Sequence, residues 1–204
     1  DGANDAPVLN GNNVSFSEIG DGSPGLPYGT TKVLGVSLSD VDAGTDTFTV
    51  TGTADHGTVL AAPGGQSLAA GVSGSFADIS SLFNGGAVYT PDNTSPTDKV
   101  TLTITDGHGG SDTLNFIFKQ VAPGGVTLTG TAGKDIIFSS AGDDTMTGLA
   151  GQDNFVFAPA SGHDTIMDFT HGEDKIDLHL LTSGPTAGTI ASWLQSTAVE
   201  TIGS

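Results

Sequence analysis

Short runs of alternating apolar and polar residues fill the first 120 positions of this 204-residue chain. The clearest is 98–105, where Val100, Leu102 and Ile104 fall on one face of a strand, and a lysine and threonines fall on the other. Further β-rich runs lie at 13–17, 31–38, 47–51, 58–60, 74–76, 87–90 and 113–118, separated by turn sequences such as Asp-Gly and Pro-Gly-Gly. This spacing predicts an antiparallel β-sandwich of about 100 residues, with one helical turn at 77–83.

Beyond residue 126 the pattern changes to a nine-residue period. Three units follow one another without a gap, at 130–138, 139–147 and 148–156. The units place Gly, Asp and an apolar residue at alternate positions, which are Gly133, Asp135 and Ile137, then Gly142, Asp144 and Met146, then Gly151, Asp153 and Phe155. A fixed short period predicts stacked turn-and-strand units, with the apolar residues pointing into a narrow core.

The repeat resembles the Gly-Gly-x-Gly-x-Asp-x-apolar-x calcium-binding nonapeptide of RTX proteins. The resemblance implies a short parallel β-roll in which two units complete one coil, so that 130–135 stacks on 148–153 and 139–144 lies on the opposite edge. It implies Ca²⁺ held between stacked turns by Asp carboxylates and turn carbonyls. The implied ligand positions are Gly130, Ala132, Gly133, Asp135, Ser139, Ala141, Gly142, Asp144, Gly148, Ala150, Gly151 and Asp153. Because Thr131, Ser140 and Leu149 replace the second glycine of the motif, we expect one or two ordered sites.

After residue 156 the period breaks, because Asp164 follows Asp153 by eleven residues instead of nine. We therefore expect an insertion around Pro159. Residues 162–178 resemble the segment that closes the β-roll of type I-secreted RTX proteins. That resemblance implies Asp164 and Asp168 as further calcium ligands and Phe169, Ile176 and Leu178 as a cap on the core. Residues 178–204 resemble the start of the C-terminal target region of such proteins, and a helical turn at 190–194 would place Trp193 as a core cap.

The acidic residues of the first half suggest a second calcium site. Residues 1–7 resemble the linker of cadherin-type repeats, and residues 39–44 resemble their Asp-x-Asp turn. The resemblance implies a site at the N-terminal pole, shared with a preceding repeat module and formed by Asp1, Asn4, Asp5, Glu18, Asp40, Asp42 and Asp106. The alternative is that these residues only form turns through hydrogen bonds from the backbone to their side chains.

Composition and the absence of known catalytic motifs limit the classes of function that we expect. Twenty-three acidic residues face five lysines, a formal net charge of −18, which argues against nucleic acid as a partner. The chain has no cysteine, and no apolar run is long enough for a transmembrane helix. We find no nucleophile elbow, phosphate loop or zinc-binding histidine pattern, so we expect a protein without enzymatic activity.

Together these patterns predict an all-β chain, with a cadherin/Ig-like sandwich at 1–121, a linker at 122–126, and a β-roll with a small C-terminal cap at 127–204. We interpret it as the calcium-binding C-terminal part of a large RTX adhesin at the bacterial surface. Its expected partners are calcium, preceding modules of the same polypeptide and the type I secretion machinery, and we expect a monomer. Low calcium inside the cell would keep the roll unfolded for export, and external calcium would fold it.

Two other functions stay open at this stage. The chain is alternatively the non-catalytic tail of an RTX-secreted enzyme, in which case a catalytic domain would precede it instead of tandem repeats. The sandwich alternatively binds a glycan or peptide, for which Tyr28, Tyr89 and Trp193 are the aromatic candidates.

Overall fold

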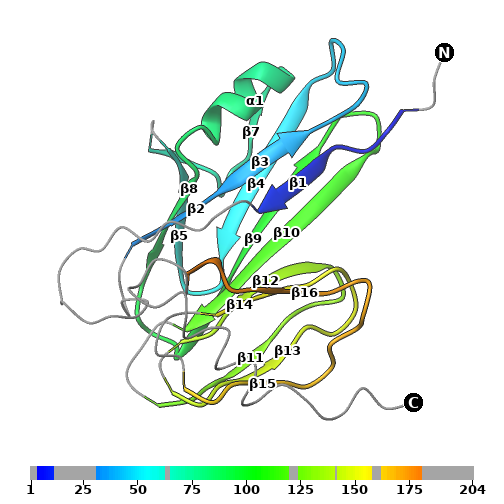
Figure 1. Ribbon diagram of the computed structural model, residues 1–204. Coiled ribbons are helices and arrows are strands. Elements are labelled where there is room, and N and C mark those ends of the chain that lie inside the picture. The colour runs from blue at the N-terminus through cyan, green and yellow to red at the C-terminus, as the bar shows by residue number, and fades with distance from the viewer. Residues whose placement is uncertain are drawn as a thin grey trace.

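The computed structural model describes residues 4–11, 31–62, 65–119, 124–140, 142–157 and 162–180. Strands dominate these ranges, and α1 is the only helix within them. The expected all-β fold, with a sandwich followed by a roll, is confirmed (Figure 1). The run expected at 13–17 and the helical turn expected at 190–194 lie outside the described residues. No helix in the described part of the chain is both long and apolar enough to cross a bilayer.

The N-terminal sandwich is built from two antiparallel sheets and a short strand pair. One sheet has the order β2 (Lys32–Leu34), β8 (Ala87–Pro91), β5 (Gly57–Ala61) and β6 (Gln66–Ser67). The sheet that faces it contains β10 (Ser111–Lys119), β9 (Thr97–Thr105), β4 (Phe48–Ala54) and β7 (Val72–Gly74). The pair consists of β1 (Val8–Gly11) and β3 (Val36–Ser39).

Side-chain alternation explains this sandwich. Along β9 the residues Val100, Leu102 and Ile104 are fully buried, as the sequence pattern predicts, while the threonines between them are only partly covered. The helix α1 (Phe76–Leu82) begins one residue before the predicted turn, and a capping box between Ser75 and Asp78 fixes its start. The run predicted at 31–38 divides into β2 and β3, which belong to different sheets, and β1 and β6 were not predicted.

The C-terminal region is a parallel roll with two sheets. The upper sheet contains β12 (Lys134–Phe138), β14 (Asn154–Val156) and β16 (Lys175–Asp177), and the lower sheet contains β11 (Thr127–Thr129), β13 (Thr145–Thr147) and β15 (Thr165–Ile166). Thr127 pairs with Thr145, an offset of two nine-residue units. Thr145 pairs with Thr165, so the next coil is two residues longer, as the late position of Asp164 predicts.

The sandwich and the roll share one sheet. Strand β10 pairs with β9 antiparallel on one side and with β12 parallel on the other, so the upper sheet of the roll continues a seven-stranded sheet in the order β16-β14-β12-β10-β9-β4-β7 (Figure 1). The domain boundaries at 121 and 127 stay a prediction. The structure adds that β10 of the sandwich and β12 of the roll are hydrogen-bonded in one sheet, which the sequence patterns did not indicate.

Candidate calcium sites of the roll

The turns of the roll stack at its two edges. The first edge carries the turns 130–133 and 148–153 and the segment 167–174, which lead from the lower sheet to the upper one. The second edge carries the connections from the upper sheet back to the lower one, including Asp144 and Asp164. The strand register therefore places 130–135 beside 148–153 and puts Asp144 on the opposite edge, as the nonapeptide period implies.

The repeated Asp position forms a ladder of aspartates on each edge. On the first edge the Asp135 amide donates to Asp153 Oδ1 at 3.1 Å, and the Asp153 amide donates to Asp174 Oδ1 at 3.1 Å. On the second edge the Asp144 amide donates to Asp164 Oδ1 at 3.0 Å. One oxygen of each accepting carboxylate thus holds the backbone of the preceding coil.

The second oxygen of most of these carboxylates is bound within its own turn. The amides of Thr131, Ser140 and Thr170 each donate to Oδ2 of the aspartate four residues later, at 2.6, 2.6 and 2.7 Å. The Ser140 hydroxyl also donates to Asp144 Oδ2, at 2.8 Å. A hydroxyl residue stands at the start of each of these turns, so Asp135, Asp144 and Asp174 are already hydrogen-bonded without a cation.

The turn before β14 differs from these three turns. Leu149 stands where the other turns have Thr or Ser, and its amide donates to Asp168 Oδ2 at 2.8 Å, while the Gly148 amide donates to Asp168 Oδ1 at 2.9 Å. Asp153 is only 2% exposed, and its Oδ2 has no hydrogen-bond partner. A buried carboxylate oxygen without a donor is costly, and a bound cation would satisfy it.

The charges around Asp153 strengthen this assignment. Burial raises the pKa of Asp153 to about 6, and repulsion from Asp135, Asp174 and Asp168 acts in the same direction. Burial also raises the pKa of Asp135, although hydrogen bonds from Thr131 act against the shift. A carboxylate whose pKa is raised by burial and by neighbouring carboxylates is stabilised in its charged form by a cation placed beside it.

Glycines bring the backbone against these carboxylates. A Cβ at Gly148 would overlap Asp153 Oδ2, and a Cβ at Gly130 would collide with the Gly148 carbonyl oxygen and with Asp135 Oδ2. Gly151 has φ +131° and lies against the Gly133 carbonyl. Carbonyl and carboxylate oxygens therefore approach closely along the first edge, which is the donor set that calcium prefers.

Of the remaining predicted ligand positions, some are buried or lie against the backbone of a neighbouring turn, and others are exposed to solvent. Ser139 is buried, and Gly142 approaches the backbone of Gly124 and Gly125 on the second edge. Ala132 and Ala150 are exposed, and Ala141 lies outside the described residues. Nowhere in the described ranges do three or more His, Asp or Glu side chains gather closely enough to hold a metal ion by themselves. Any site must therefore draw on main-chain carbonyls as well, as the nonapeptide resemblance implies.

Asp174 was missed as a candidate ligand. It is the third member of the first-edge ladder, below Asp153. Its signal was present, because Gly172, Asp174 and Ile176 repeat the Gly-x-Asp-x-apolar pattern at a longer offset. The segment expected to close the core does so incompletely, since Phe169 is 41% and Ile176 is 52% exposed.

The N-terminal pole brings together its described candidates. Asn4 Nδ2 donates to Asp106 Oδ2 at 2.7 Å, the Asp5 backbone amide to Asp42 Oδ2 at 3.2 Å, and the Asp42 backbone amide to Asp40 Oδ1 at 3.0 Å. Burial, followed by the charges of Asp42 and Asp106, raises the pKa of Asp40. The hydrogen bond from Asn4 lowers the pKa of Asp106.

Some contacts at the pole are local turn contacts, such as that of Asp42 with Asp40, whereas Asn4–Asp106 and Asp5–Asp42 join segments far apart in the sequence. Asp106 Oδ1 also accepts the amides of His108 and Gly110, so this carboxylate is fully engaged. Calcium binding at the pole stays a prediction, and two of its proposed ligands, Asp1 and Glu18, lie outside the described residues.

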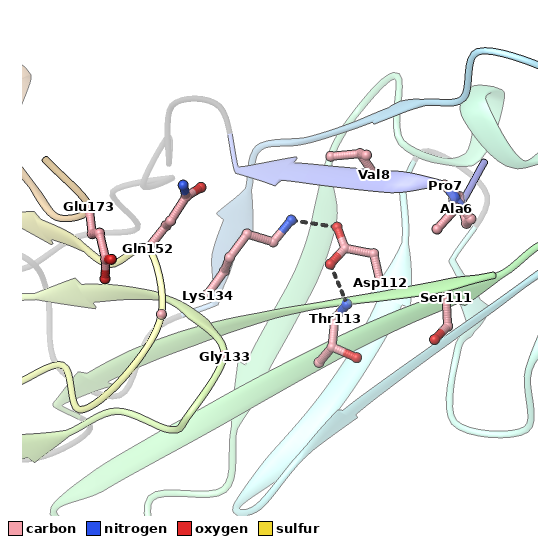
Figure 2. Close-up of a pocket in the computed structure, with 11 residues that line it drawn as sticks. Ala6, Pro7, Val8, Ser111, Asp112, Thr113, Gly133, Lys134, Gln152 and Glu173 are labelled. Carbon is pink, nitrogen blue, oxygen red and sulfur yellow. Dashed lines mark hydrogen bonds and ion pairs between the residues drawn. The ribbon is translucent and has the colours of Figure 1, made fainter.

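An open hollow of about 710 Å³ lies between the first edge of the roll and the sandwich. Figure 2 shows Lys134 reaching across it to Asp112, whose other oxygen accepts the Thr113 amide, with Gln152 and Glu173 on the roll side. No aromatic residue lines this hollow. Tyr89 is fully buried in the sandwich core and so presents no ring to a ligand. Tyr28 and Trp193 lie outside the described residues.

Two comparisons with protein families agree with this geometry. Residues 4–119 match the family model of a bacterial Ig domain. Residues 127–155 match the model of the RTX calcium-binding nonapeptide repeat. No curated protein and no solved structure matches the chain.

Proposed function

The chain belongs to the bacterial Ig domain family, and on this premise we propose that it is a calcium-binding, non-enzymatic segment of a large RTX adhesin outside the cell. A bacterial Ig-like domain followed by RTX calcium-binding repeats is a combination suited to a modular surface protein. Under this proposal the roll completes its folding on calcium after type I export. The segment acts as a monomer, next to further modules of the same polypeptide.

The observation that carries the proposal is the unpartnered Asp153 Oδ2. This oxygen is buried in a turn stack where Asp168 and Asp174 lie on the next coil. Calcium would offset the negative charge of these neighbouring carboxylates. The chain itself supplies the oxygens, holds the Asp135 and Asp153 amides on the ladder, and uses Gly130 and Gly148 to let the backbone come close.

The absence of an enzymatic role is part of the proposal. What supports it is that the carboxylates of the ladder are committed to backbone amides, so none is positioned as an acid and base pair over a substrate cleft. The hollow beside Lys134 is spanned by an ion pair and is open to solvent.

Calcium titration of the full chain by isothermal calorimetry tests the proposal. We expect saturable binding of one or two ions and little response to magnesium, because magnesium requires a stricter octahedral shell. Asp153→Asn should weaken calcium binding more than Asp143→Asn, since the Asp143 residue is exposed and its carboxylate accepts a hydrogen bond from the His163 backbone amide. Absence of calcium uptake by the unmodified chain would refute the proposal.

A further inference from the structure

Strand β10 serves two structures at once. Its residues Phe116 and Phe118 are buried in the sandwich core, while Ile117, on the opposite face, packs in the core of the roll with Leu128 and Ile137. Ile117 is in register with Ile137, and Ile137 with Phe155. The sandwich therefore supplies the strand on which the first coil of the roll is built.

The outer face of the upper roll sheet is buried at its sandwich end. Ile136 and Phe138, which flank the inward residue Ile137, are 6% and 1% exposed and belong to the sandwich core. Ring contacts continue from Tyr89 to Phe118 at 4.8 Å and from Phe118 to Phe138 at 6.2 Å. The corresponding positions are Thr145 and Thr147 in the second repeat and Asn154 and Val156 in the third, and of these Val156 also packs in the sandwich core. The first repeat thus carries apolar residues on both faces because it lies between two cores.

Polar contacts also fix the first coil to the sandwich. Lys134 Nζ donates to the Leu9 carbonyl at 2.9 Å and pairs with Asp112. The Asn115 side chain donates to Thr131 Oγ1 at 3.1 Å. The amide and hydroxyl of Thr131 in turn hold Asp135. The turn before β12 is therefore held without a cation by both its own residues and the sandwich.

The far end of the roll, at β16, lacks the support of the sandwich, although Thr170 holds Asp174 within its own turn. At this end the outer face of the upper sheet presents Lys175 and Asp177, and Ile176 is 52% exposed on the inward side. Leu149, Met167 and Phe169 are also exposed, at 53%, 62% and 41%. The unpartnered Asp153 Oδ2 lies in the turn that leads into this region.

We propose that the roll is divided by its calcium requirement, so that the near coil, β11 and β12, is folded on the sandwich without calcium, whereas the far coils, β13 to β16, require calcium bound at the buried carboxylate of Asp153 together with main-chain carbonyls of the turn stack. This inference rests on the proposed calcium-binding function. Calcium then sets how far the ordered sheet extends beyond β12, and the Ig-like domain remains folded in its absence.

Hydrogen exchange followed by mass spectrometry on the full chain tests this division. The amides of β12 should be protected alike in chelator and in millimolar calcium. The amides of β14 and β16 should exchange at least about tenfold faster in chelator, because local opening removes their protection. Equal loss of protection in β12 and β16 would overturn the proposal, and so would calcium uptake that leaves β14 and β16 unchanged.

Single substitutions locate the division within the ladder. Asp153→Asn should raise the calcium concentration for half-protection of β16 by about tenfold, since it removes the unpartnered carboxylate oxygen from the cation. Asp135→Asn should change that concentration less than about threefold, because Thr131 already occupies its carboxylate. Equal shifts for Asp135→Asn and Asp153→Asn would contradict the division.

Calorimetry and hydrogen exchange together distinguish failure of the proposed calcium-binding function from failure of the proposed division of the roll. A chain that binds no calcium by calorimetry and shows no exchange response anywhere would refute the proposed function itself. A chain that binds calcium but loses protection in β12 and β16 together would retain that function and refute only the division.

Discussion

The near and far ends of the roll have the same repeat but different surroundings. In the near coil Ile136, Ile137 and Phe138 are all buried, whereas in β16 the residues Lys175 and Ile176 are exposed. Strand β12 lies between β10 and β14, whereas β16 is the edge strand of the same sheet and pairs with β14. The sandwich adds to this difference, because it covers the outer face of β12 and not that of β16. A repeated sequence therefore does not guarantee repeated stability.

The largest expected effect comes from the near end. Phe138→Ala removes a fully buried ring that packs against Phe118, and should lower the free energy of unfolding by about 3–5 kcal/mol. The matched control is Phe169→Ala at the far end, where the ring is 41% exposed and the loss should stay below about 1 kcal/mol. Urea unfolding in chelator, followed by circular dichroism, measures both. Similar losses would remove the distinction between the ends.

Asp153 provides a pH-dependent test of the junction between the ends. Its folded-state pKa of about 6 exceeds the ordinary value, so the folded state binds the proton more tightly than the unfolded state does. The stabilisation is complete below the unfolded pKa and is lost as the pH rises through about 6. In chelator, lowering the pH from about 7 to 5 should therefore add about 1 kcal/mol from this group.

Asp153→Asn should abolish that pH-dependent gain. Because the amide carries no charge to desolvate, the variant should also be more stable than the unmodified chain in chelator at neutral pH, while binding calcium less tightly. Chemical denaturation across the pH series provides the comparison. An unchanged pH dependence in the variant would show that another group is responsible.

The sequence predicted the repeat geometry well, because the nine-residue period, together with the two-unit coil that the RTX resemblance implies, gives the pairing of Thr127 with Thr145 and of Ile136 with Asn154. It did not predict that β12 joins β10. The signal was the apolar pair Ile136 and Phe138, set against the threonines of the second repeat. Periodicity identifies which residues point into the roll, whereas the partner of the outer face depends on a tertiary contact.

The candidate site was predicted in part for a similar reason. Asp153 and Asp168 were assigned from motif positions. Whether a carboxylate accepts hydrogen bonds within its own turn differs between turns that carry a hydroxyl residue, such as Ser140, and the turn that carries Leu149. Asp174 was overlooked because its offset from Asp153 departs from the nine-residue period. Longer coils displace the ladder position in sequence while the stacking in space continues.

Lys134 tests the polar attachment of the near coil. Lys134→Ala removes the bonds to Leu9 and Asp112 and should cost about 1–2 kcal/mol, because Asp112 is partly buried and loses its cation. Lys99→Ala is the matched control, since its pair with Asp55 is exposed and should contribute below about 0.5 kcal/mol. Thermal unfolding of the two variants gives the comparison, and equal melting temperatures would argue against the attachment.

The smallest expected effect concerns Leu149, which has φ +75° in the turn before β14. Leu149→Gly should relieve this backbone conformation and add about 0.5–1 kcal/mol to stability in calcium. Ala150→Gly, at a neighbouring exposed position without positive φ, should instead lower stability by about 0.5–1 kcal/mol. Calorimetric melting separates the two, and a loss in both variants would mean that the Leu149 side chain contributes packing.

Limited proteolysis of the full chain in chelator and in calcium, with the resistant fragments weighed by mass spectrometry, tests the division of the roll most directly. In chelator the resistant core should extend past Phe138, and in calcium it should extend to Asp177 or beyond. A chelator-resistant core that ends before residue 126 would show that the whole roll depends on calcium and would contradict the account.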